Sequence, residues 1–159
     1  MILAGDIGGT KAQLALFEGA GSARAPKSEM RLPTRGSASL ETLVQQFLGA
    51  TGARPTRMVF GIAGPVNDNR CVTTNLPWQV DGASMSAQFG APVTLLNDLE
   101  ATAWGLGTLE SKDLEVLQPG DDQTGHRVLI AAGTGLGEAL LRWDGKHWHP
   151  MPSEGGHTD

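Results

Sequence analysis

The chain has 159 residues, of which 40% are hydrophobic and 18% are charged, so it can bury a sizeable core and has the composition of a soluble globular protein. Its formal net charge of -5 argues against a general nucleic-acid binder. Its one cysteine, Cys71, excludes an intrachain disulfide framework and fits a reducing cytoplasm.

The N-terminal sequence "MILAGDIGGT" lacks the basic region and the long apolar stretch of a secretory signal. No apolar run in the chain approaches the ~20 residues that span a bilayer. We therefore expect a cytoplasmic protein that binds neither a membrane nor nucleic acid.

The first third of the chain predicts a hairpin, an edge strand and a helix. Residues 1–5 and 11–19 have the pattern of apolar strands around the turn "DIGGT", and residues 29–34, "EMRLPT", that of a polar edge strand ended by proline. Residues 39–52, "SLETLVQQFLGATG", give the clearest helix, which Ser39 can cap and a later glycine can end. One apolar stripe at helical spacing supports this helix: Leu40, Leu43, Val44, Phe47 and Leu48.

The rest of the chain alternates strands with helices, which predicts an α/β fold with a mixed sheet. The expected helix that starts at Asp81 has this residue as its cap. The expected elements are strands at 57–64, 70–75 and 91–97, helices at 81–90 and 99–107, a short strand with a polar turn at 113–126, and two strands within 127–145.

Two segments of the chain share one plan. Residues 2–19 and 128–145 each contain an apolar strand, a Gly/Thr turn, a second apolar strand and an acidic-Gly exit. This weak internal repeat, with a period of about 120 residues, suggests two related domains that each open with a glycine-turn hairpin.

The two Gly/Thr turns, "GDIGGT" and "GTGLG", have the composition of phosphate-binding turns, because successive backbone N–H groups can form an anion nest. Neither turn matches a Walker motif or a dinucleotide fingerprint, and each also fits an ordinary hairpin turn. A carboxylate such as Asp6 inside a phosphate turn is repulsive unless a cation lies between, and Mg²⁺ held by a carboxylate and water would serve.

Several polar residues admit both a structural and a ligand-binding interpretation. Asp98 directly follows a buried strand, where it can be a helix cap or part of a substrate site. Asn97 and Asn75 suit sugar hydroxyls or local turn hydrogen bonds, whereas Trp78 is expected to pack rather than to stack on a ligand. The "HWH" at 147–149 suggests a metal site, but without a Cys or carboxylate partner set a surface strand is favoured.

Six segments, taken in order, resemble the bacterial glucokinases of the sugar kinase/actin/heat-shock ATPase superfamily. They are "GDIGGTKAQLAL", "GIAGPV", "TNLPW", "LLNDLEATAWG", "AGTGLGEA" and "EGGH". The resemblance implies two ribonuclease-H-like α/β domains with the active site between them. We therefore expect a small N-terminal domain at 1–108, with a mixed sheet and flanking helices. The opening strands of a larger, similar but incomplete domain are expected at 109–159.

The same resemblance implies ATP-dependent phosphorylation of glucose at its 6-hydroxyl, with Mg²⁺ as cofactor. Asp98 becomes the catalytic base, and Asp6 the carboxylate on the Mg²⁺ side, acting through water. The other residues that the resemblance assigns are Gly8, Gly9, Thr10, Gly133, Thr134 and Gly135 against the ATP phosphates, and Asn75, Asn97, Asp98, Glu154 and His157 against the sugar.

The sequence also departs from this family. Its members are roughly twice as long, in keeping with two full domains, and the part expected to be missing carries the adenine-binding glycine motif and a further sugar-binding glutamate. Lys11 follows "GGT" where many members have asparagine, and Glu138 adds negative charge beside the second glycine turn.

Further expectations concern the chain and the full-length protein. We expect a homodimer for the full-length enzyme and little activity for these 159 residues alone. Unpaired edges and exposed apolar surface at 127–143 would favour a partner chain, swapping or aggregation. The alternative function is a non-catalytic sugar-binding or regulatory member of the same superfamily. The related repressors carry a DNA-binding segment, which no residues before the first hairpin provide here.

Overall fold

The computed structural model describes the whole chain except residues 20, 22, 122, 133–135, 154 and 156–159. The chain forms two compact units, Met1–Asp98 and Leu99–Asp159. Helix α3 (Asp98–Gly105) packs its apolar side chains against the strands that follow it in the chain. The predicted domain boundary after residue 108 stays a prediction.

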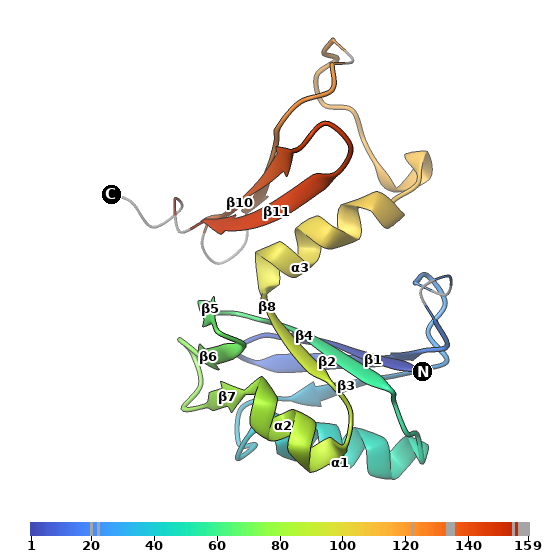
Figure 1. Ribbon diagram of the computed structural model, residues 1–159, viewed down its shortest axis with the longest axis vertical. Helices are drawn as coiled ribbons and strands as arrows, with labels where there is room; N and C mark the ends of the chain where they lie inside the picture. Colours follow the sequence, from blue (N-terminus) through green and yellow to red (C-terminus); the bar gives the residue numbers. More distant parts are fainter. Residues whose placement is uncertain (20, 22, 122, 133–135, 154, 156–159) are drawn as a thin grey trace. The chain divides into compact units, whose positions relative to one another are not determined.

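The first unit is built on a five-stranded mixed sheet (Figure 1). Strand β1 pairs antiparallel with β2 and parallel with β4, and β4 pairs parallel with β8. The sheet therefore confirms the α/β class, the N-terminal hairpin and the polar edge strand. In spatial order, the strands are β3 (Ser28–Pro33), β2 (Lys11–Phe17), β1 (Ile2–Ile7), β4 (Arg57–Ile62) and β8 (Val93–Asn97).

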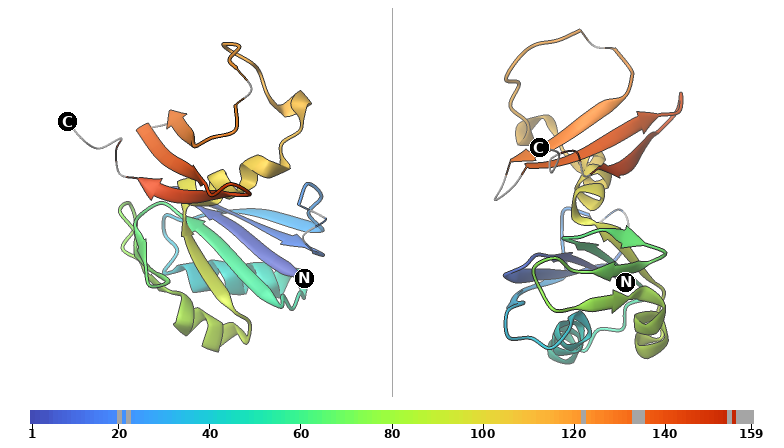
Figure 2. Two further views of the ribbon diagram at one scale, coloured as in Figure 1. Left: turned by 45° about the horizontal axis from the view of Figure 1, so that its top comes forward. Right: turned by 90° about the vertical axis from the view of Figure 1, so that its left-hand side faces the viewer.

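Helices α1 (Leu40–Thr51) and α2 (Gly82–Phe89) lie on the same side of this sheet (Figures 1 and 2). Because side chains alternate along a strand, every second residue of the sheet faces these helices. The two layers share one core, which includes Leu3, Ile7, Leu14, Leu16, Met58, Phe60 and Ile62 of the sheet and Leu40, Leu43, Val44, Phe47 and Met85 of the helices.

The predicted caps of both helices are confirmed. The Ser39 side chain accepts a hydrogen bond from the backbone N–H of Thr42, and α1 ends at Gly52 in the left-handed region, with φ of 64°. The Asp81 carboxylate accepts hydrogen bonds from the backbone N–H groups of Ala83 and Ser84, at 2.9 and 3.0 Å. These side chains satisfy amide groups that have no partner within the helix.

A second, small antiparallel sheet follows β4, with the order β5 (Val66–Asn67), β6 (Arg70–Val72) and β7 (Gln79–Asp81). Strands β5 and β6 are joined by Asp68 and Asn69, both with positive φ, 48° and 59°. Two consecutive residues with positive φ are typical of a tight hairpin turn, and Asp and Asn tolerate this conformation better than most residues.

The second unit contains a three-stranded antiparallel sheet with the order β11 (Trp148–Ser153), β10 (Leu136–Trp143) and β9 (Arg127–Ala132). Ala139 and Leu141 of β10 are buried with Ala103 of α3 in a small cluster of their own. Short 3₁₀ helices, η2 (Leu106–Thr108) and η3 (Ser111–Asp113), follow α3. The two strands that the repeat predicts for this segment are present before and after residues 133–135.

One predicted element is wrong. The structure has no strand at the described residues of 113–126, although "LEVL" within this stretch has three apolar residues that suggest one. Leu114, Val116 and Leu117 are instead exposed, at 59%, 71% and 94%. A strand needs a neighbouring strand or a core to bury its side chains, and neither meets these residues.

The sheet of the second unit has apolar residues on its surface, as the sequence analysis expects. Strand β10 is paired on both sides, so β9 and β11 are the edge strands. Val128, Leu140 and Met151 lie opposite one another across the three strands. The exposed large apolar residues of these strands are Val128, Ile130, Leu136, Leu140 and Met151.

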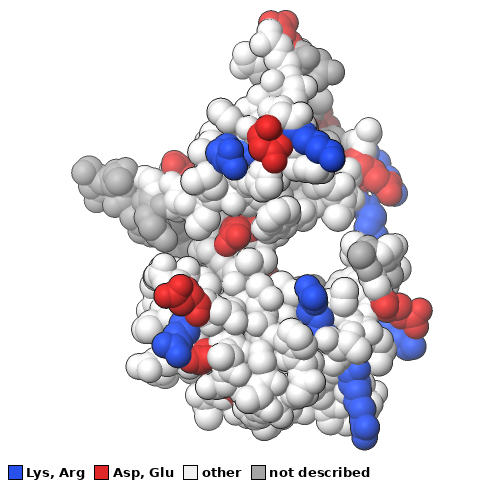
Figure 3. Space-filling view, in the orientation of Figure 1, with Lys and Arg blue, Asp and Glu red and all other residues white. Residues whose placement is uncertain are grey.

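The surface has charges of both signs. On the face drawn in Figure 3, Lys and Arg side chains lie interspersed with Asp and Glu. None of the helices in the described part of the chain has the length and apolar character needed to cross a bilayer.

Candidate active site

The candidate site lies where three neighbouring parallel strands end. Ile7 of β1 is in register with Ile62 of β4, and Ile62 is in register with Asn97 of β8. The residues that follow, at the Gly8–Gly9 turn, at the Ala63–Gly64 turn and at Asp98, therefore leave the sheet along one edge. Neighbouring strands lie about 4.8 Å apart, so the first turn and Asp98 are separated by two strand spacings. Ligands of open α/β sheets bind in this place, outside the carboxyl ends of the strands.

The first glycine turn is a tight connection between β1 and β2. The backbone N–H of Gly8 donates to the carbonyl of Lys11 at 3.0 Å. Asp6 and Thr10, on either side of the turn, are exposed. A carboxylate this close to a phosphate turn would need a bridging cation if an anion bound there.

Asn75 lies against this turn. A Cβ on Gly9 would stand 2.8 Å from the Asn75 Cβ, so only glycine allows the loop to approach so closely. Gly8, Gly9, Ala63 and Asn75 line one narrow crevice. The structure thus brings the predicted phosphate turn and a predicted sugar residue together.

The loop that carries Asn75 is held by its own hydrogen bonds. The Thr73 hydroxyl donates to the carbonyl of Leu76 at 2.8 Å, and the Thr73 N–H donates to the carbonyl of Trp78 at 3.1 Å. Trp78 is 2% exposed and its indole N–H donates to the carbonyl of Ser37. The prediction that Trp78 packs rather than stacks on a ligand is therefore confirmed.

Asn97 is fixed to the neighbouring turn. Its Nδ2 donates to the carbonyl of Gly64 at 3.2 Å, which sets the orientation of the amide at the end of β8. This bond joins residues 33 positions apart, so it is a tertiary contact and not the local turn hydrogen bond of the predicted alternative. The same bond presents the side chain at the edge where the three strands end.

Asp98 is half-buried and is the first residue of α3. A carboxylate is stabilised there by the positive end of the helix dipole. Its closeness to Cys71 is visible in the thiol, whose pKa is raised by burial and, to a smaller extent, by the negative charge of Asp98. Asp98 therefore lies near Cys71 and directly follows Asn97, whose amide is bonded to the Gly64 carbonyl.

Five predicted site residues lie outside the described part of the chain: Gly133, Thr134, Gly135, Glu154 and His157. The strands before and after residues 133–135 pair antiparallel, with Ala132 opposite Leu136. The predicted roles of these five residues stay predictions.

The "HWH" segment has a structural explanation. His149 lies in β11 and its Nε2 is 2.6 Å from the Asp144 carboxylate. The backbone N–H groups of Lys146 and His147 also donate to Asp144, at 2.8 and 2.7 Å. No group of three metal-ligating side chains occurs within the ranges that the structure describes.

One residue that is bonded to the strand leading into this site was not predicted from the sequence. Asn69 makes two hydrogen bonds to the backbone of β8. The dipeptide Asp68–Asn69 could have indicated the tight turn. The hydrogen bond from the Asn69 side chain to a strand 24 residues later cannot be predicted from neighbouring residues.

The order of the strands, the turns at their carboxyl ends and the flanking helices define a sugar-kinase-type α/β fold. A family model described as glucokinase matches residues 3–159. The chain therefore belongs to the glucokinase family.

Curated relatives bear the same name. A glucokinase of Trichormus variabilis is 38% identical over the whole chain, and one of Mesorhizobium japonicum is 35% identical over 99% of it. The chain covers 48% and 47% of these relatives, so it spans about half their length.

Solved structures agree in fold. A glucokinase from an Antarctic psychrotroph has a TM-score of 0.83 at 27% identity, over 99% of this chain and 51% of that protein. A ROK family glucokinase from Streptomyces griseus, solved with glucose and AMPPNP, has a TM-score of 0.60 at 25% identity, over 93% of this chain and 46% of that protein.

Proposed function

We propose that the protein containing this chain transfers the γ-phosphoryl group of ATP to the 6-hydroxyl of glucose, giving ADP and glucose 6-phosphate. The observation that carries this proposal is the common register of Ile7, Ile62 and Asn97. It supports a site in which the phosphate turn, the sugar-binding amide of Asn97 and the carboxylate of Asp98 lie at one edge of the sheet. The glucose and AMPPNP bound to the Streptomyces griseus relative agree with these substrates.

Asp98 is the general base of the proposed reaction. Its carboxylate accepts the proton of the 6-hydroxyl while that oxygen bonds to the γ-phosphorus. The bond from this phosphorus to the bridging oxygen breaks, and ADP leaves with the electron pair. Positioned proton transfer of this kind contributes a factor of about 10² to 10⁴ to the rate. The carboxylate is half-buried at the start of α3, close to Cys71.

Asn75 and Asn97 orient the sugar. Asn75 is exposed beside the Gly8–Gly9 turn, and Asn97 is held by the Gly64 carbonyl. An amide can both donate to and accept from sugar hydroxyls. On family resemblance, Glu154 and His157 contact further ring hydroxyls.

The ATP phosphates lie on Gly8, Gly9 and Thr10, and on Gly133, Thr134 and Gly135. Asp6 is exposed at the end of β1, and it belongs to no group of three metal-ligating side chains among the residues with described positions. One carboxylate with water and phosphate oxygens suits Mg²⁺, which prefers such a ligand set. When bound, Mg²⁺ would offset the phosphate charge during transfer.

The remaining parts of the proposal concern the whole protein. It is a cytoplasmic homodimer whose N-terminal domain is joined near residue 108 to a larger second domain. The 159 residues alone have negligible kinase activity, since the family's two domains together form the cleft.

The proposal is tested by a coupled assay for glucose 6-phosphate on the complete gene product. Asp98→Asn keeps the size of the side chain and removes the base, so kcat is expected to fall by about 10² to 10⁴. The matched control is Asp68→Asn, which makes the same change at an exposed carboxylate in the β5–β6 turn and is expected to keep full activity. Near-complete turnover in Asp98→Asn would refute the base. Glucose binding without any turnover in the wild type would favour the non-catalytic alternative.

A further inference from the structure

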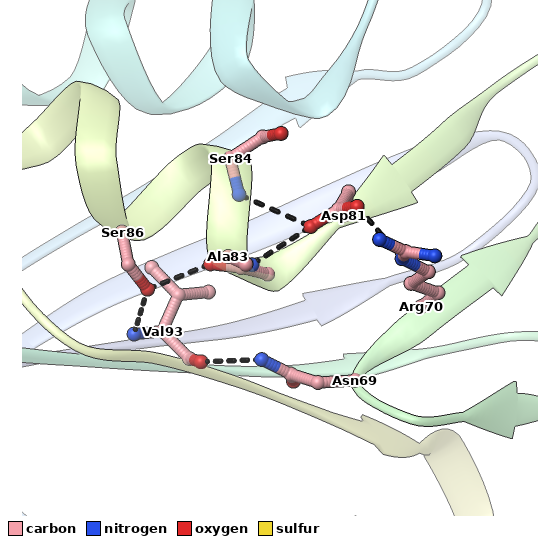
Figure 4. A network of polar contacts seen from close by, with 8 residues as sticks. Asn69, Arg70, Asp81, Ala83, Ser84, Ser86 and Val93 are labelled. Atoms are coloured by element: carbon pink, nitrogen blue, oxygen red, sulfur yellow. Dashed lines mark hydrogen bonds and ion pairs between the residues drawn. The ribbon is translucent and has the colours of Figure 1, made fainter.

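Strand β8 leads to Asn97 and Asp98 and is an edge strand. Its outward-facing backbone groups form hydrogen bonds with side chains instead of a neighbouring strand. Strand β8 is last in the sheet order β3-β2-β1-β4-β8. The Val93 N–H donates to the Ser86 hydroxyl at 2.9 Å, and the Val93 carbonyl accepts from Asn69 Nδ2 at 2.9 Å. The Leu95 N–H donates to Asn69 Oδ1 at 2.8 Å. Figure 4 shows Asn69 and Ser86 reaching Val93 from two different elements.

The amide of Asn69 therefore replaces a neighbouring strand for two residues. It donates through one atom and accepts through the other, as a strand backbone does. An amide is the side chain that offers both groups at this spacing, since a carboxylate can only accept. Backbone groups at a sheet edge otherwise exchange partners with water, and such edges open easily.

Asn69 is itself held by its surroundings. Its carbonyl accepts from the Gly82 N–H at 3.0 Å. A Cβ on Gly82 would overlap the Asn69 amide, so the start of α2 has to be glycine for this amide to reach β8. Next to it, Arg70 donates to the Asp81 carboxylate at 2.8 Å, and Asp81 caps α2 (Figure 4).

Ser86 connects the same helix to the strand. Its hydroxyl donates to the Gly82 carbonyl at 2.6 Å and accepts from the Val93 N–H. The hairpin, the helix and the strand thus form one hydrogen-bonded unit, whose members are Asn69, Gly82, Ser86, Val93 and Leu95.

We propose that Asn69 is a positioning residue for catalysis, which holds the end of β8 so that Asn97 and Asp98 keep their places. The proposal rests on the proposed function of Asp98. Leu95 precedes Asn97 by two residues, so the two backbones face the same side of the strand. The Asn69 bond to Leu95 is thus close to the catalytic pair, and only Leu96 and Asn97 intervene before Asp98.

The expected consequence is a loss of rate rather than of ATP binding. A misplacement of about 1 Å at a reacting group can cost about 10² in rate. Glucose contacts through Asn97 would weaken as well. The Gly8–Gly9 turn belongs to β1, two strands away, so the KM for ATP stays unchanged.

Asn69→Gly in the complete gene product is the test. Glycine accepts the φ of 59° without strain and removes the amide. We expect kcat to fall by about tenfold to a hundredfold, with a higher KM for glucose and an unchanged KM for ATP. Asp68→Gly is the matched control, because its φ is 48° and its side chain is exposed. Equal kinetics in the two variants would overturn the proposal.

A double-mutant cycle separates positioning from general stability. In an Asp98→Asn background, where the base is absent, Asn69→Gly should change the residual kcat by less than about twofold. A full additional loss would show that Asn69 acts by another route and would overturn the proposal. If Asn69→Gly fails to fold, Ser86→Ala serves as the second variant, because it removes only one bond to Val93. We expect a smaller loss of kcat in Ser86→Ala, and unchanged kinetics would contradict the proposal.

The outcomes distinguish the proposed function from the proposed role of Asn69. If the wild-type protein did not phosphorylate glucose, both proposals would be overturned. Active wild type, inactive Asp98→Asn and fully active Asn69→Gly would leave the proposed function standing and overturn only the role of Asn69.

Discussion

The side chain of Asn75 fills the place beside Gly9, so a Cβ on Gly9 would stand 2.8 Å from the Asn75 Cβ. Real Cβ contacts are longer, and Gly9→Ala should therefore push the Asn75 loop away from the turn. Because Asn75 is proposed to bind sugar, the KM for glucose should rise by about tenfold, the cost of one neutral hydrogen bond. Steady-state kinetics with each substrate varied in turn measures this.

Gly49→Ala is the control for this variant. Gly49 lies on the exposed face of α1 with open space around it, so alanine should stabilise the helix by up to about 1 kcal/mol and leave both KM values unchanged. If Gly9→Ala raised only the KM for ATP, Asn75 would not be a sugar residue.

Asp6→Asn should change the dependence of the reaction on Mg²⁺. The exposed Asp6 carboxylate is the acidic group next to the first glycine turn, and asparagine keeps its size without its charge. The Mg²⁺ concentration for half-maximal activity should rise by about tenfold or more, because ligand charge sets affinity for a hard cation. Titration of activity with Mg²⁺ at saturating ATP and glucose measures it. An unchanged Mg²⁺ dependence would remove Asp6 from the metal site.

The β10–β11 hairpin should lose stability in acid. The His147 N–H, the His149 ring and the Lys146 N–H, in this order of effect, hold the pKa of Asp144 well below its usual range. A lowered pKa in the folded state means that the carboxylate stabilises the hairpin above its unfolded pKa of about 3.9. This contribution disappears as pH falls below that value toward the folded pKa.

Amide exchange of β10 and β11 between about pH 5 and pH 2 tests this prediction. Asp144→Asn keeps an oxygen for the two backbone N–H groups, which both bond to Oδ1, but it does not titrate. Its exchange protection should be lower than that of the wild type at neutral pH and should vary less across the acid range. Parallel pH curves for both proteins would contradict the role of Asp144.

Local patterns predicted most of the first unit. Helix α1 has an apolar stripe, a serine cap and a glycine end, and each of these signals acts within a few residues. The hairpin of β1 and β2 is equally local, and six ordered motifs indicated the family to which the chain belongs.

Features that depend on distant residues were harder to predict. The strand expected within 113–126 has suitable residues but no partner, and pairing is decided by the rest of the fold. The first unit ends at Asp98 because Ala103 of α3 packs with Ala139 and Leu141, a contact across more than thirty positions of sequence. Asn69 acts on a strand that follows a whole helix later.

The site was predicted as a set of residues, without its geometry. Asn75, Asn97 and Asp98 were named from motifs and amide or carboxylate chemistry. The register of β1, β4 and β8 places Asn97 and Asp98 at the same sheet edge as the first glycine turn, and Asn75 lies against that turn; no single motif encodes either arrangement. The predictions at residues 133–135, 154 and 157 lie outside the described residues.

Thr34→Val should stabilise the first unit. Thr34 is fully buried, and its Oγ1 has no hydrogen-bond partner within the described ranges of the chain. A buried hydroxyl without a partner costs about 1 to 3 kcal/mol, and a methyl group of similar size does not carry this cost. The free energy of unfolding should therefore rise by about 1 kcal/mol, as measured by urea denaturation.

Thr73→Val is the matched control, since Thr73 is also buried but its hydroxyl donates to the Leu76 carbonyl at 2.8 Å. This substitution leaves an acceptor without its partner, so the free energy of unfolding should fall by about 1 kcal/mol. The two variants make the same chemical change at two buried positions, and only the hydrogen bond differs. Their effects should therefore have opposite signs. A similar loss of stability in both would show that the Thr34 hydroxyl is satisfied in solution, for instance by a buried water molecule.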